Sequence, residues 1–96
     1  MNGLIVAAIE QRRQLKLVYS VGSRIVEPHV YGLASNSKEL LRCYQLAGES
    51  ASRRRAGSKL LRARSVVAVE VLDVRFEPRA GYKPGDPPIR EVIARV

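Results

Sequence analysis

Residues 15–34 read LKLVYSVGSRIVEPHVYGLA, which is two extended segments joined by a short turn. Apolar Leu15, Leu17 and Tyr19 occupy every second position, and a period of two residues is typical of a β-strand with one buried face. The turn falls at 21–23, where Gly22 can adopt a positive φ. The segment 24–34 is again extended and rich in Val, Ile and Tyr. We therefore predict two strands here.

The residues before this stretch have a different period. Leu4, Ile5, Ala8 and Ile9 lie on one stripe of a helix, and Asn2 can cap its first turn. We predict a helix over about residues 3–13. A helix this short is not stable alone in water, so it must pack on a sheet. The expected buried residues are Leu4, Ile5, Ile9, Leu15, Leu17, Val67, Val69 and Val71.

Three further strands are predicted downstream, over residues 40–47, 59–65 and 66–74. Residues 77–88 contain four of the five prolines, so they form a loop without regular structure. The last segment, 89–96, has apolar Ile89, Val92, Ile93 and Val96 at helical spacing. We predict a helix there, with a strand as the alternative.

These elements predict a single, mainly β domain of 96 residues with an N-terminal α-helix. Pro28 cannot donate to a ladder and marks an edge, a bend or a bulge, and Gly32 is a second bend point. Closing a short, bent sheet removes its unpaired edges. We therefore expect a small five-stranded antiparallel barrel over about residues 15–75.

The chain is basic, with 17 Lys and Arg against 9 Asp and Glu. Residues 48–65 carry six basic residues and one acidic residue, and this concentrated charge attracts polyanions. The alternative is a solvated loop that only keeps the protein in solution. No apolar run approaches the ~20 residues of a membrane span, and no basic residue precedes Arg12 as in a secretory signal. Cys43 has no partner for a disulfide, so we expect a cytoplasmic protein without membrane contact.

Several motifs in this order resemble a WYL domain, a sensor module of bacterial transcription regulators. The matching segments are Ala8-Ile9 with Arg12-Arg13, 15–19, 24–29, 41–44, 59–62 and 66–76. The family's Trp-Tyr-Leu triplet falls on Glu39-Leu40-Leu41, and its Asp-Arg pair falls on Arg64-Ser65. The resemblance implies an Sm-like, SH3-type barrel and a nucleic-acid or nucleotide ligand held by basic residues. It also implies a helix-turn-helix regulator as a partner.

The candidate anion-binding residues are Arg24, Arg42, Lys59, Arg62 and Arg64. A guanidinium group suits phosphate because it can make two parallel hydrogen bonds. Tyr44 shares a strand face with Arg42 and could stack on a base. We expect Arg53, Arg54 and Arg55 to attract the ligand electrostatically without reading it. The alternative is that the strand arginines pair with Glu27, Glu39 and Glu70, and that Tyr44 lies in the core.

The remaining chemistry-bearing residues have structural interpretations. We expect His29 to be a hydrogen-bonded structural histidine, Cys43 a small core residue and Asp86 a turn former. No phosphate-loop, dinucleotide or zinc motif is present, so we predict no catalysis, metal or cofactor. The sequence therefore predicts a regulatory module that binds single-stranded nucleic acid or a phosphorylated nucleotide-like ligand in bacterial transcription regulation or stress defence. The alternative is an assembly domain that forms a homodimer.

Overall fold

A computed structural model gives the fold of residues 2–48, 56–83 and 85–96. Helix α1 (Gly3–Gln11) begins at Asn2, whose Oδ1 accepts hydrogen bonds from the backbone N–H groups of Leu4 and Ile5. The cap therefore forms as predicted. The helix ends two residues earlier than predicted, because Arg12 adopts a left-handed φ of 52°. That reversal sends the chain directly into the first strand.

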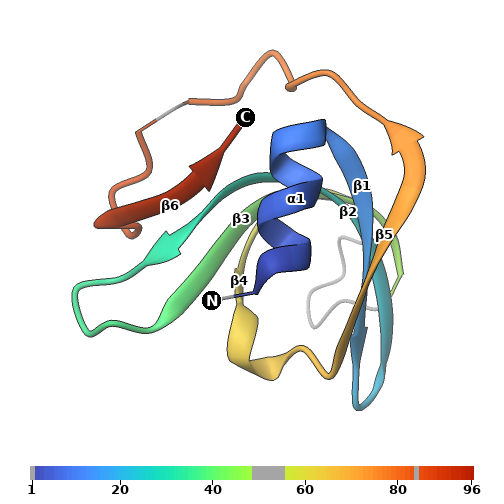
Figure 1. The fold of residues 1–96 in the computed structure, drawn as a ribbon, viewed down its shortest axis with the longest axis horizontal. Coiled ribbons are helices and arrows are strands. Elements are labelled where there is room, and N and C mark those ends of the chain that lie inside the picture. The colour runs from blue at the N-terminus through green and yellow to red at the C-terminus, as the bar shows by residue number, and fades with distance from the viewer. Residues whose placement is uncertain (1, 49–55, 84) are drawn as a thin grey trace.

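Six antiparallel strands form one curved sheet around α1 (Figure 1). They are β1 (Arg13–Tyr19), β2 (Gly22–Leu33), β3 (Glu39–Gly48), β4 (Gly57–Arg62), β5 (Ala68–Arg75) and β6 (Glu91–Arg95). The order is β4-β3-β2-β1-β5, and β6 pairs with β2. A mainly β fold with an N-terminal helix is thus confirmed. No pairing joins β4 to β5 in the described residues, so the sheet is open and a closed barrel is not confirmed.

Strand β2 is long and pairs along one edge with two different strands. Its first half pairs with β1, and its second half pairs with β6. The register against β3 shifts between Pro28 and Val30, which is the irregularity that Pro28 predicted. The register against β3 also shifts between Ile25 and Val26, and the register against β6 shifts between Tyr31 and Gly32. These bends curve the sheet and give its distal half a separate partner.

The connection from β4 to β5 differs from the prediction of a strand over 59–65. Strand β4 ends at Arg62, and Ala63–Ser65 form a 3₁₀ turn. The turn is needed because β4 and β5 lie at opposite ends of the sheet order. Strand β5 therefore starts at Ala68, and Val67, which was expected in the core, is 71% exposed.

The core lies between α1 and the facing side of the sheet. It is built from Ile5, Ala8, Ile9, Leu15, Leu17, Val26, Tyr31, Leu41 and Cys43. Val69 and Val71 are half-buried against it. Leu4 is 50% exposed, so its predicted burial was wrong. It lies one position, about 100° of helix rotation, away from Ile5, and the fully buried residues of the helix are Ile5, Ala8 and Ile9.

The C-terminal segment is a strand and not the predicted helix. The backbone N–H of Arg90 donates to the Leu33 carbonyl, and that of Val96 donates to the His29 carbonyl. The free edge of the distal half of β2 thus supplies hydrogen-bond partners that helical spacing of side chains cannot reveal. Within the part of the chain that the structure describes, no helix has the length and apolar character needed to cross a membrane.

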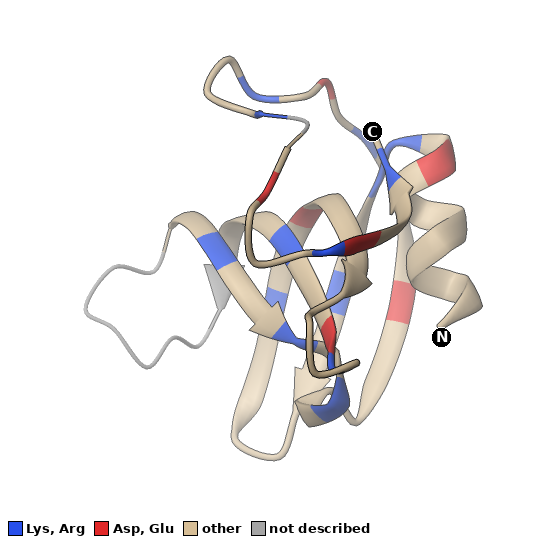
Figure 2. Ribbon diagram, turned by 90° about the vertical axis from the view of Figure 1, so that its left-hand side faces the viewer, with Lys and Arg blue, Asp and Glu red and all other residues tan. Residues whose placement is uncertain are grey.

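Residues 77–83 and 85–88 connect β5 to β6 without regular structure, as predicted, and we call them the strap. Figure 1 shows the strap passing over the top of the sheet from β5 on one side to β6 on the other. In Figure 2 the strap is the loop at the upper left, with α1 at the right. Lys and Arg positions lie on several strands and on the strap, with Asp and Glu positions among them.

Candidate ligand-binding site

A cavity of about 650 Å³ lies between the strap and the sheet. Its floor includes Arg42 and Tyr44 of β3, which alternate with buried Leu41 and Cys43 and therefore face away from α1. The other lining residues are His29 of β2, Ser58 of β4, and strap residues Arg79, Ala80, Gly81, Tyr82, Lys83, Gly85, Asp86 and Pro87. Cavities of about 300–1,000 Å³ are typical of small-molecule sites.

Arg42 makes a two-point ion pair across the cavity with Asp86 of the strap. Its Nε donates to Asp86 Oδ2 at 2.6 Å, and its second guanidinium nitrogen donates to Oδ1 at 3.3 Å. The Asp86 side chain is only 8% exposed, whereas Arg42 is 29% exposed. Asp86 is therefore more than the turn former that we predicted, because its carboxylate ties the strap to β3.

A second ion pair anchors the other end of the strap. Arg79 donates to both carboxylate oxygens of Glu27, at 2.9 and 3.3 Å. Its guanidinium also lies 4.0 Å from the centre of the Tyr44 ring, a cation–π distance. The hydrogen bond to Glu27 is the main reason that the pKa of Arg79 is raised. Glu27 does pair with an arginine, but this arginine comes from the strap and not from a strand.

His29 lies beneath the strap with one ring nitrogen unsatisfied. The residue is 5% exposed, and its Nε2 has no hydrogen-bond partner among the described residues. Its ring centre lies 5.1 Å from that of Tyr82 and 5.9 Å from that of Phe76. The prediction that His29 is hydrogen-bonded is thus wrong for its Nε2 atom. The strap leaves one polar atom at the cavity wall without a partner.

Burial lowers the pKa of His29 below 6.5; Arg79 and Arg42 lower it further, and Glu27 opposes them. Between the folded-state pKa and 6.5 the unfolded chain binds more protons, so stability rises with pH. We expect the free energy of unfolding to fall as the pH drops from about 7 to 5. Urea titrations should show a flatter profile for His29→Phe, which keeps an aromatic ring but does not titrate. An unchanged pH slope in His29→Phe would contradict this assignment.

The residues predicted to form one anion site are divided between three places. Arg42 and Tyr44 both line the cavity. Arg62 lies on the same face of the sheet but does not line the cavity. Arg24 and Lys59 lie on the opposite face of the sheet. The Arg24 guanidinium donates a hydrogen bond to the buried side chain of Gln45, and Lys59 of β4 lies directly opposite buried Cys43 of β3. Arg24 also lies 5.0 Å from the centre of the Tyr19 ring.

Arg64 lies in a third place, a cavity of about 550 Å³ at the N-terminus of α1. That cavity also includes Tyr31 and Glu39, which are hydrogen-bonded to each other. Arg53, Arg54 and Arg55 lie outside the described residues. The alternation of side chains along each strand showed which residues of that strand share a face. It did not show which faces of different strands lie side by side in the fold.

Cys43 is a core residue, as predicted. It is fully buried, and burial raises the pKa of its thiol to about 12. The thiol is therefore protonated at neutral pH and is a weak nucleophile. Within the described ranges no three His, Cys, Asp or Glu residues are grouped so as to hold a metal ion.

Sequence reasoning missed the strap as part of the site. Arg79, Tyr82, Lys83 and Asp86 all line the cavity, yet none was a candidate binding residue. The one available signal was the length of the segment, since long irregular loops in compact domains are commonly functional. Comparison with models of known protein families, with characterised proteins and with solved structures finds no match to this chain.

Proposed function

We propose that the protein is a binding module that accepts a phosphorylated, nucleotide-like ligand between β3 and the strap. The observation that carries this proposal is the composition of the cavity wall. Three cationic side chains, Arg42, Arg79 and Lys83, share it with the rings of Tyr44, Tyr82 and His29. Cations match phosphate oxygens, and aromatic rings match the face of a base.

The size of the cavity favours one nucleotide over a strand. A single strand is normally bound along an open basic groove that follows its backbone. Here the strap is held to the sheet at Arg79 and again at Asp86, so the space beneath it is bounded at both ends. Single-stranded nucleic acid is therefore an outcome to be tested and not the leading ligand.

The wider form of the proposal follows the resemblance in sequence. In that form the chain is a WYL-like sensor domain with an Sm-like or SH3-type fold. It acts in the cytoplasm, in bacterial transcription regulation or stress defence, together with a helix-turn-helix regulator. In this role the module binds its ligand without converting it.

Lys83→Ala tests the cavity directly, because Lys83 is exposed and no carboxylate pairs with it in the described residues. We expect the Kd for ADP, measured by isothermal titration calorimetry, to rise about five- to tenfold, or ~1–1.4 kcal/mol. Lys38→Ala is the matched control, since Lys38 is an exposed lysine in the turn between β2 and β3 and lies outside the cavity. Its Kd should stay within about twofold of the wild-type value.

Three results would change the proposal. Equal weakening by the two lysine variants would mean that only net charge matters. Tighter binding of a labelled single strand than of ADP, measured by fluorescence anisotropy, would favour the nucleic-acid form. No binding of either probe, together with a dimer in analytical ultracentrifugation, would favour the assembly alternative.

A further inference from the structure

The Arg42–Asp86 pair has the geometry of an occupied anion site. Two oxygens of one carboxylate accept from two nitrogens of one guanidinium, at 2.6 and 3.3 Å. A phosphate group presents two oxygens to the same fork. The pair also borders the cavity, since both residues line it.

The charges around the cavity favour exchange of this carboxylate for a phosphate. Arg42, Arg79 and Lys83 face two carboxylates, Glu27 and Asp86, so one positive charge is in excess. Moving Asp86 into solvent raises the excess to two. A terminal phosphate group carries about −1.5 to −2 at pH 7, which matches the site after the exchange and not before it.

The two carboxylates differ in how they are held. Glu27 belongs to β2 and is paired opposite Tyr44 of β3, so its backbone cannot move without breaking the sheet. Asp86 lies between Gly85 and Pro87 in a segment with no strand pairing. Its backbone carbonyl accepts one local hydrogen bond, from Ile89 N–H. Rotation of Asp86 away from Arg42 therefore leaves every strand pairing intact.

We infer that Asp86 holds the phosphate position of the cavity, so that a phosphorylated ligand binds by displacing this carboxylate from Arg42. The inference rests on the proposed function and deepens it. It makes the Arg42 fork the phosphate subsite and makes the strap a competitor for that subsite. The measured affinity of the wild-type chain is then the affinity for phosphate reduced by the strength of the internal pair.

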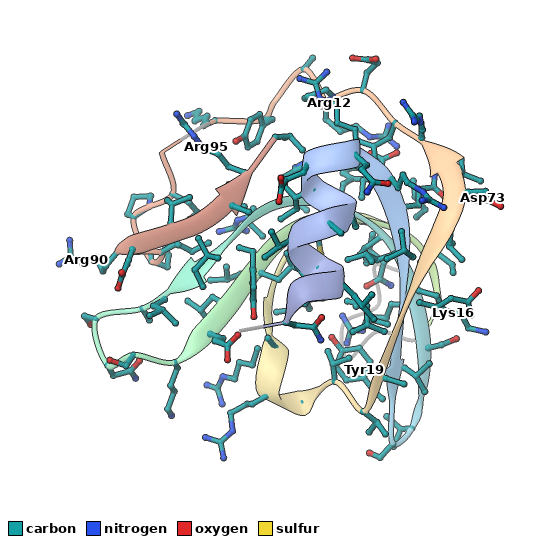
Figure 3. All side chains as sticks on the ribbon, in the orientation of Figure 1. Arg12, Lys16, Tyr19, Asp73, Arg90 and Arg95 are labelled. Carbon is teal, nitrogen blue, oxygen red and sulfur yellow. The ribbon has the colours of Figure 1, made fainter. Side chains whose placement is uncertain are left out.

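The test uses Asp86→Asn, which removes the competing charge and nearly preserves the shape. We expect the Kd values for ADP and pyrophosphate, measured by calorimetry, to fall about five- to tenfold. Asp73→Asn is the matched control, with the same charge change at an exposed residue that pairs with Arg13. Figure 3 shows Asp73 on the opposite side of the molecule from Arg90, which follows the strap. Asp73→Asn should leave both Kd values within about twofold.

The outcomes separate this inference from the function on which it rests. If the wild-type protein binds ADP and Lys83→Ala weakens it, but Asp86→Asn binds no more tightly, the inference alone is overturned. If Asp73→Asn tightens binding as much as Asp86→Asn, the gain is due to net charge and the inference fails. If neither wild type nor Asp86→Asn binds ADP or pyrophosphate, both proposals fail.

If Asp86→Asn does not fold, a measurement on the wild-type chain tests whether phosphate displaces the Asp86 carboxylate. The Nε–H group of Arg42 gives a side-chain signal in ¹H–¹⁵N correlation spectra. We expect this signal to shift on saturation with pyrophosphate, while the Nε–H signal of Arg13, which donates to the Leu72 carbonyl and does not line the cavity, stays in place. An unmoved Arg42 signal in a protein that binds pyrophosphate would overturn the exchange.

Discussion

Gly32→Ala is expected to lower the free energy of unfolding by about 3 kcal/mol or more and to weaken ligand binding with it. A Cβ atom at Gly32 would overlap the backbone carbonyl oxygen of Glu91 and lie 2.6 Å from Ile89 Cγ2. Because one obstacle is backbone, side-chain rotation cannot relieve it. The change therefore pushes β6 off the distal half of β2, and β6 anchors the C-terminal end of the strap.

Thermal unfolding followed by circular dichroism measures this effect, and 1 kcal/mol corresponds to about 4–8 °C in a domain of this size. Gly3→Ala is the control, because nothing lies within 4 Å of a Cβ built there. Since Ala favours helix over Gly, that variant should be neutral or slightly more stable. A Gly32→Ala protein that melts with the wild type would show that β6 does not lie against Gly32.

Ile9→Ala is expected to destabilise the protein by about 2–4 kcal/mol, because it removes buried atoms and leaves a cavity. Ile9 is 1% exposed and belongs to the core cluster with Leu15 and Leu17. A nine-residue helix has little stability of its own, so loss of this contact weakens the packing of α1 on the sheet. Urea titration gives the change in unfolding free energy.

Leu4→Ala on the same helix is the matched comparison. Leu4 is 50% exposed, so the same kind of truncation should cost less than about 1 kcal/mol. Comparable losses in the two variants would mean that α1 is docked through a wider stripe than Ile5, Ala8 and Ile9.

The candidate site was predictable only where it lies on a strand. Arg42 and Tyr44 could be placed on one face because residues two apart on a strand share a side. Their partners could not be found in this way, because Arg79 and Asp86 lie in a segment without periodicity, 37 and 44 residues away from Arg42 in sequence. Charge along the chain also misled us, since Arg24 and Lys59 point to the other face of the sheet.

The local part of the architecture followed from the order of the residues. The Asn2 cap, the change of period at Leu15, the irregularity at Pro28 and the alternation along β3 each depend on a few neighbouring residues. Such features arise from backbone sterics and local hydrogen bonds, so they can be predicted without knowing the fold.

Only the tertiary structure decided three further features: the open sheet, the conformation of residues 91–95 and the ion pairs that hold the strap. Residues 91–95 form a strand because the distal half of β2 has a free edge beside them. Arg42 meets Asp86 and Arg79 meets Glu27 because β6 returns the chain to that same edge. Hydrogen bonds and charge pairs between distant segments depend on where the backbone is folded, and a one-dimensional pattern carries no record of that position.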